Sequence, residues 1–164
     1  MKICFGTDGW RGVISREFTF DNVRRVTAAI ALHVEESGSA SKGVAVGYDR
    51  RFLSDSYARE AAGVLAARGI PVKLAPAYLP TPVVSWAVKD QGLAGGIVVT
   101  ASHNSAEWNG IKFKEPFGGS SRTWVNERIE IYLRESVPPG DEIPCLGIEE
   151  AASAGLLQTV QSFR

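Results

Sequence analysis

Cysteine is scarce in this chain of 164 residues, which contains only Cys4 and Cys145. Two cysteines are too few for a disulfide framework, and neither belongs to a Cys-x-x-Cys pair or to a Cys/His spacing typical of zinc. We therefore expect both thiols to be small, buried or half-buried side chains in a reducing compartment.

Long apolar runs are also missing. No stretch approaches the roughly 20 residues that span a bilayer, and the polar, glycine-rich N-terminal sequence has no apolar signal-peptide core. We therefore expect a cytoplasmic protein with no membrane partner.

Neither sign of charge is in excess, because the 18 basic and 18 acidic side chains cancel to a net charge of zero. This balance gives no reason to expect a nucleic acid or an anionic membrane surface as partner. An anionic ligand would have to be bound by a local cluster of positive groups.

The composition is that of an ordinary folded domain, with 45% apolar and 9% aromatic residues. Short β-branched runs alternate with longer amphipathic stretches, which predicts an α/β fold. We expect a three-layer α/β/α domain with a mixed, mainly parallel sheet over residues 1–137. Residues 138–164, which begin Pro138-Pro139-Gly140, are expected to form a C-terminal extension or linker toward a second domain.

The expected elements follow from periodicity, caps and glycine stops. Thr19 can cap the first helix, and Gly69 can end the second. Helices are predicted from residue 20 to Gly38, over 54–68, from 80 through 87, over 122–135 and, more weakly, over 148–154. Strands are predicted over 43–48, 70–75, 95–100, 111–114 and 156–160.

Three polar segments stand out: Gly6 to Gly12, Asp49 to Arg51, and Ala101 to Asn104. The first is punctuated by glycines and is expected to be turn-rich. The other two follow predicted strands, and ligands of open α/β sheets bind beyond the carboxyl ends of the strands.

These segments and Lys112 supply a hydroxyl, an imidazole, an amide, guanidinium groups and an ammonium, a set that suits phosphate. A hydrolase pair of Ser102 with His103 is disfavoured, because adjacent side chains seldom face each other and no Gly-x-Ser-x-Gly motif is present. From the residues alone, phosphate binding remains one interpretation among several.

Five segments resemble the α-D-phosphohexomutase family in order and spacing. The resemblance extends from about Ile3 to Leu157, and the Thr-Ala-Ser-His-Asn segment is its most specific part. The segments are Phe5-Gly6-Thr7-Asp8-Gly9-Trp10-Arg11-Gly12, Gly47-Tyr48-Asp49-Arg50-Arg51, Pro80-Thr81-Pro82, Thr100-Ala101-Ser102-His103-Asn104 and Asn109-Gly110-Ile111-Lys112-Phe113.

The resemblance implies the N-terminal domain of a phosphoglucomutase or phosphomannomutase, with a phosphoglucosamine mutase as an open alternative. Such an enzyme interconverts hexose 1-phosphate and hexose 6-phosphate through a phosphoserine, here Ser102, and a bisphosphate intermediate. It also implies that His103 contacts the substrate or assists proton transfer, and that Arg11 and Lys112 stabilise charge or act as acid and base. Such transfer depends mainly on positioning and electrostatics.

The resemblance also implies that Asn104 and Arg51 bind phosphate. It further implies a magnesium ion that binds Ser102 through the phosphate on that serine. An ion pair of Asp49 with Arg51 that braces neighbouring loops is an alternative for Arg51. His33 is expected at the surface or an interface. The four tryptophans are expected to pack in the core or loops.

Two departures from the family pattern matter. Ser105 follows Asn104 where the family often has proline, and the metal loop Asp-Gly-Asp-x-Asp-Arg is absent from this sequence. We therefore expect the isolated chain to be inactive. Its partners would be a hexose phosphate and the remaining domains of a longer enzyme. A stand-alone, non-catalytic binding or assembly module of the same fold is the alternative, and the length of the natural gene product discriminates between the two.

Overall fold

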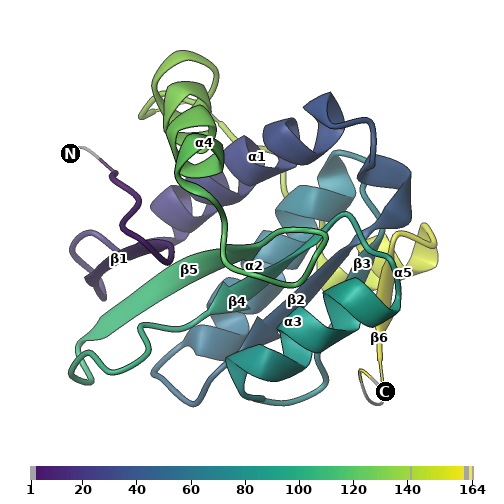
Figure 1. The fold of residues 1–164 in the computed structure, drawn as a ribbon, viewed down its shortest axis with the longest axis horizontal. Helices are drawn as coiled ribbons and strands as arrows, with labels where there is room; N and C mark the ends of the chain where they lie inside the picture. The colour runs from purple at the N-terminus through teal and green to yellow at the C-terminus, as the bar shows by residue number, and fades with distance from the viewer. Residues whose placement is uncertain (1–2, 141, 161–162, 164) are drawn as a thin grey trace.

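Six strands form one mixed sheet in the order β1-β5-β4-β2-β3-β6 (Figure 1). The structure is a computed structural model that describes residues 3–140, 142–160 and 163. The strands are β1 (Trp10–Val13), β2 (Val44–Tyr48), β3 (Val72–Leu74), β4 (Gly95–Val99), β5 (Trp108–Lys114) and β6 (Leu157–Thr159). The helices are α1 (Phe20–Glu36), the 3-10 turn η1 (Ala40–Lys42), α2 (Ser54–Ala67), α3 (Thr81–Asp90), α4 (Thr123–Glu135) and α5 (Ile148–Ser153).

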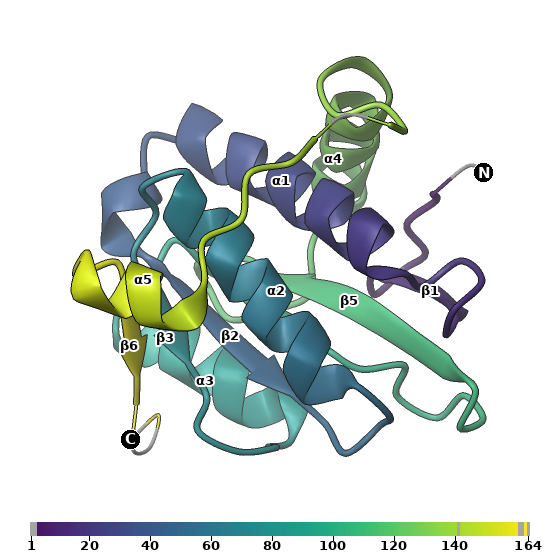
Figure 2. The same cartoon turned by 180° about the vertical axis from the view of Figure 1, so that it is seen from behind.

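The sheet is parallel at its centre and antiparallel at one side. β4, β2, β3 and β6 run parallel, whereas β5 is antiparallel to both β4 and β1. Helix α3 covers one face, and α1 and α2 cover the other, with α4 beside α1 and α5 beside α2 (Figures 1 and 2). The predicted three-layer α/β/α architecture with a mixed, mainly parallel sheet is confirmed.

Helix α1 begins and ends where the sequence predicts. The Thr19 side chain accepts a hydrogen bond from the backbone N–H of Asn22 at 3.2 Å, which satisfies one free donor of the first turn. The helix ends before Gly38, which has the left-handed φ of 69° that glycine adopts easily. Its buried face contains Val23, Val26, Ile30 and Val34.

Strand β1 was not predicted, because Gly6 to Gly12 was interpreted as a turn-rich segment. Residues 10–13 instead pair with β5, with Trp10 opposite Ile111 and Arg11 opposite Gly110. Trp10 is buried and stacks on Phe18 with 4.9 Å between ring centroids. The burial of this tryptophan stabilises an edge strand that the polar, glycine-rich sequence does not indicate.

Other expectations need smaller corrections. Strand β5 begins at Trp108 rather than at Ile111, and β3 is limited to residues 72–74. His33 is half-buried, with its ring edge-on to Phe113 and Trp124, so it does not lie free on the surface.

Three side chains are more exposed than the sequence led us to expect. Cys4 is exposed, whereas Cys145 is half-buried as expected. Trp86 and Trp124 are about half exposed, at 48% and 53%, and do not pack in the core.

The segment after residue 137 adds to the same sheet. Helix α5 packs beside α2, and β6 pairs in parallel with β3, with Val72 opposite Leu157. Residues 161, 162 and 164, at the end of the predicted extension, lie outside the described residues. Among the helices described, none is long and apolar enough to span a membrane.

Candidate functional site

Ser102 lies just beyond the carboxyl end of β4, and Asp49 lies just beyond the carboxyl end of β2. These two strands are parallel neighbours, so the two polar segments meet at one edge of the sheet. Ser102 and His103 are both exposed there. The segments line an open hollow of about 570 Å³, bordered by Asp49, Arg50, Arg51, Phe52, Ser102, Asn104 and Ala106.

The backbone of Ser102 has a left-handed conformation, with φ of 59°. For a residue with a side chain this conformation costs about 1–2 kcal/mol, so the neighbouring structure must stabilise it. The Ser102 N–H donates to Thr100 Oγ1 at 2.9 Å, and the Ser102 carbonyl oxygen accepts from Arg51 Nη2 at 2.9 Å. Both polar groups of this residue's backbone are thereby fixed, and its side chain is left exposed.

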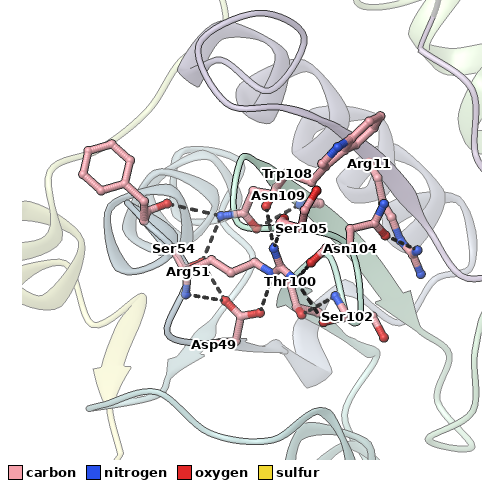
Figure 3. A network of polar contacts seen from close by, with 12 residues as sticks. Arg11, Asp49, Arg51, Ser54, Thr100, Ser102, Asn104, Ser105, Trp108 and Asn109 are labelled. Atoms are coloured by element: carbon pink, nitrogen blue, oxygen red, sulfur yellow. Dashed lines mark hydrogen bonds and ion pairs between the residues drawn. The ribbon is translucent and has the colours of Figure 1, made fainter.

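Arg51 is the centre of a network that spans the whole loop (Figure 3). Its Nη1 donates to the carbonyl oxygens of Ser105 at 2.7 Å and Trp108 at 3.0 Å. Its Nη2 donates to those of Ser102 at 2.9 Å and Asn104 at 2.6 Å. The four N–H groups of the two terminal nitrogens are therefore all used within the protein.

Asp49 and Asn109 support this network from the sheet. Asp49 Oδ2 lies 3.3 Å from Arg51 Nε, and Asp49 Oδ1 accepts from the Arg51 backbone N–H and the Ser54 hydroxyl, each at 2.9 Å. Asn109 Nδ2 donates to Ser54 Oγ at 2.9 Å. These contacts tie the end of β2 and the start of β5 to the start of α2.

Arg11 reaches the same loop from β1. Its Nη1 donates to Asn104 Oδ1 at 2.6 Å. Arg11 lies opposite Gly110 of β5, where an added Cβ would lie 3.0 Å from Arg11 Cγ and 2.7 Å from the carbonyl oxygen of Thr100. Only a residue without a side chain leaves room for the Arg11 side chain to cross β5 toward Asn104.

Lys112 is paired with Asp8. Its Nζ lies 2.6 Å from Asp8 Oδ2, and Lys114 Nζ lies 3.2 Å from Asp8 Oδ1. The Ser120 hydroxyl donates to Asp8 Oδ1 at 2.7 Å. Lys112 is two residues from Gly110 along β5, so both lie on the same face of the sheet, and Arg11, which pairs with Gly110, shares that face.

In this group one carboxylate, that of Asp8, pairs with two lysines, so one positive charge is left in excess. The side chains of Lys112 and Lys114 are only 8% and 6% exposed. Burial alone would raise the pKa of Asp8. The hydrogen bonds from Lys112 and Ser120 and the charge of Lys114 outweigh burial and hold the pKa of Asp8 below its usual value.

The expected site residues thus fall into two groups. Arg11, Arg51, Ser102 and Asn104 are joined by hydrogen bonds in the loop, with His103 exposed beside Ser102. Lys112 is instead tied to Asp8. Four supporting residues were not predicted as part of the site, although each lies within or beside one of the sequence motifs: Asp8, Ser54, Thr100 and Asn109.

A magnesium site does not follow from the residues of this chain alone. Over residues 3–140, 142–160 and 163, no three His, Cys, Asp or Glu side chains come together as metal ligands would. Asp49 is engaged by Arg51 and Ser54, and Asp8 by two lysines and a serine. The side chains described therefore do not form a metal centre by themselves.

The fold and this loop together define an α/β domain that presents an exposed serine among cations at the carboxyl edge of its sheet. Residues 2–137 match the sequence profile of the family described as "Phosphoglucomutase/phosphomannomutase, alpha/beta/alpha domain I". The chain belongs to this family and corresponds to its first domain.

Curated proteins with similar sequences are also named as mutases. The chain is 33% identical over 150 residues to a phosphoglucosamine mutase of Clostridioides difficile, covering 92% of the chain and 32% of that protein. It is 32% identical over 140 residues to a phosphoglucomutase of Staphylococcus saprophyticus, covering 84% of the chain and 25% of the relative. The chain thus spans about a third or less of these curated relatives.

A solved structure shows the same fold. A crystal structure described as a putative phosphomannomutase of Thermus thermophilus superposes with a TM-score of 0.77 and 44% sequence identity. The match covers 80% of this chain and 30% of that one.

Proposed function

We propose that this chain is the phosphoryl-carrying domain of a phosphohexomutase and that Ser102 is the residue that carries the phosphoryl group. The observation that supports this most is the placement of Ser102. Its hydroxyl is exposed at the carboxyl edge of the sheet, while its left-handed backbone is fixed on both sides by Thr100 and Arg51.

The proposed reaction begins with a phosphoserine. The bond between Ser102 Oγ and phosphorus breaks, a bond from phosphorus to a free hydroxyl of the hexose phosphate forms, and the proton of that hydroxyl ends on Ser102 Oγ. In the second transfer the other sugar O–P bond of the hexose bisphosphate breaks, its phosphorus bonds to Ser102 Oγ, and the serine proton ends on the sugar oxygen. The net change is the move of one phosphate between the 1- and 6-positions, and the serine is phosphorylated again at the end.

Positive groups of this chain would stabilise the transferring phosphoryl group. Arg11 is the nearest candidate, because its guanidinium already lies in the loop, hydrogen-bonded to Asn104. Lys112, on the same face of the sheet, is proposed to act as an acid or base in the transfer. Its ammonium group is paired with the Asp8 carboxylate. Such preorganised charges are a main source of catalysis in phosphoryl transfer.

His103 and Asn104 are the candidates for contacts with the substrate and its phosphate. Magnesium is proposed to bind through the phosphate on Ser102, with its remaining ligands outside this chain. Arg51 receives no phosphate contact in this proposal, because its terminal N–H groups are all donated to the loop.

A coupled mutase assay tests the proposal on the full gene product that contains residues 1–164. With glucose 1-phosphate, magnesium and a trace of hexose bisphosphate, we expect turnover that Ser102→Ala reduces to background. Residues 1–164 alone should show no turnover. Positioning supplies about 7–11 kcal/mol of a barrier, and the rest of the substrate site is expected in other domains. Undiminished turnover of Ser102→Ala would contradict the proposal.

A further inference from the structure

We infer that Arg51 is a positioning residue that fixes the peptide backbone around Ser102 and thereby sets where the serine hydroxyl lies. The catalytic consequence rests on the proposed function of Ser102. The positioning of the loop by Arg51 does not depend on that proposed function, since it concerns only contacts within this chain.

The loop has few other means of holding its shape. Residues 101–107 lie between β4 and β5 and belong to neither strand. Their own backbone contacts include Asn104 N–H to the Ala101 carbonyl at 3.1 Å and Trp108 N–H to the Ser105 carbonyl at 3.2 Å. Each of these spans only three residues, so neither ties the loop to the sheet. The long-range backbone contact from the Ile14 N–H to the Glu107 carbonyl, at 2.8 Å, holds the loop only at its end next to β5.

Arg51 supplies a long-range tie to the backbone at the Ser102 end of the loop. One guanidinium gathers the carbonyl oxygens of Ser102, Asn104, Ser105 and Trp108 within 3.0 Å. Because the guanidinium is planar and its N–H groups point in fixed directions, the four acceptors must take defined positions around it. Two of those carbonyls belong to Ser102 and to Asn104, the partner of Arg11.

The guanidinium is itself held from the sheet. Its Nε faces Asp49 Oδ2 at 3.3 Å, and Asp49 follows the last residue of β2. Asp49 is held in turn by the Ser54 hydroxyl at the start of α2. The Arg51 side chain is only 13% exposed. Arg51 thus ties the loop to the rigid part of the domain at four carbonyl oxygens, whereas Arg11 holds it at the Asn104 side chain alone.

This geometry separates positioning from phosphate binding. To bind a phosphate, Arg51 would have to release carbonyl oxygens that it now satisfies, which would free the backbone of Ser102. The two roles also differ in their response to lysine. A lysine keeps the charge that attracts a phosphate, but its three N–H groups lack the planar fork that four carbonyls require.

Amide hydrogen exchange on the 1–164 chain tests the bracing. In Arg51→Lys we expect the Ser102, Asn104 and Trp108 amides to exchange at least tenfold faster, because local opening of the loop becomes easier. The matched control is Arg50→Lys, since Arg50 is exposed and stacks on the Tyr78 ring at 3.7 Å. The control should leave these rates unchanged. Unchanged loop exchange in Arg51→Lys would overturn the inference.

A milder variant covers the case in which Arg51→Lys does not fold. Asp49→Asn removes the ion pair with Nε and leaves the four carbonyl contacts, so we expect the same amides to exchange about two- to fivefold faster. No change at these amides in Asp49→Asn would count against the inference.

Kinetics of the full gene product test the catalytic consequence. In Arg51→Lys we expect kcat to fall at least tenfold while KM for the hexose phosphate changes by less than about threefold, because the substrate contacts remain. A rise in KM alone, or normal activity, would overturn the positioning role. If the wild-type product has no mutase activity, the proposed function fails, and the exchange experiment still decides whether Arg51 braces the loop.

Discussion

Arg11 and Asn104 are 93 residues apart in the chain and are joined by a hydrogen bond of 2.6 Å from Nη1 to Oδ1. Arg11 comes from the edge strand β1, and Asn104 from the loop after β4. This contact brings the glycine-rich N-terminal segment to the exposed serine. It depends on the absence of a side chain at Gly110, over which Arg11 crosses β5.

Gly110→Ala should therefore destabilise the protein and displace Arg11. The new Cβ would lie 2.7 Å from the carbonyl oxygens of Thr100 and Trp10, so the strands must move apart. Overpacking of this kind costs about 1–3 kcal/mol, which lowers the melting temperature of a domain this size by about 2–12 °C. Calorimetry measures the shift. The control is Gly147→Ala, where a Cβ meets nothing within 4 Å. Equal melting temperatures for the two variants would contradict the packing argument.

Asp8→Asn should leave two nearly buried ammonium groups without their carboxylate. Loss of one partner of a buried ion pair costs about 3–5 kcal/mol, but Asp8 is 31% exposed, so we expect about 1–3 kcal/mol at neutral pH. The folded protein has a lower pKa at Asp8 than the unfolded chain. The contribution of Asp8 to the free energy of unfolding is therefore complete above the unfolded-state pKa and is lost as the pH falls through the folded-state pKa.

Urea unfolding of both proteins at several pH values tests this dependence. The difference in unfolding free energy between wild type and Asp8→Asn should stay constant from pH 7 to 5 and shrink below about pH 4. A difference that does not change down to pH 3 would show that the charge of Asp8 is not what stabilises the lysines.

The two cysteines should react at very different rates. Cys4 is exposed, whereas burial raises the pKa of Cys145 to about 11. At pH 8 only about one Cys145 thiol in a thousand is then the reactive thiolate. Iodoacetamide should modify Cys4 at least tenfold faster, as followed by intact mass in Cys4→Ser and Cys145→Ser variants. Equal rates would mean that Cys145 is more accessible than the structure indicates.

Magnesium should bind only when a phosphate is present. A phosphoserine adds about −1.5 to −2 charges and three acceptor oxygens, whereas a serine hydroxyl is a poor magnesium ligand. Titration calorimetry should detect negligible binding to the unphosphorylated chain. Binding to the phosphorylated chain should be weak, because Arg11, His103 and Lys112 compete for the same oxygens. Tight binding to the unphosphorylated chain would assign a metal site to carboxylates such as Asp8 or Asp49.

Local patterns predicted most of the fold. The cap at Thr19 and the apolar periodicity of α1 are local features, and so is the left-handed glycine after α2 at position 69. Strand β1 escaped prediction because its stability comes from pairing with β5 and from the burial of Trp10, which are both long-range. Neither is visible in a polar segment rich in glycine.

The candidate site was only partly predictable for the same reason. Motifs predicted Ser102, Asn104 and Arg11 as candidates, but they could not reveal that Asp8 pairs with Lys112 across 104 residues. They also left two roles open for Arg51. The directions of its N–H groups favour bracing, and they follow from the tertiary position of the loop rather than from the residues beside it.

Phosphopeptide mapping is the most direct test of the central claim, that Ser102 carries the phosphoryl group. The full gene product is incubated with a hexose 1,6-bisphosphate and magnesium, digested, and analysed by mass spectrometry, with Ser102→Ala as the control. We predict one phosphate on the peptide that contains residues 100–109, located on Ser102 and lost in the variant. A phosphate on another residue, with Ser102 unmodified, would contradict the account.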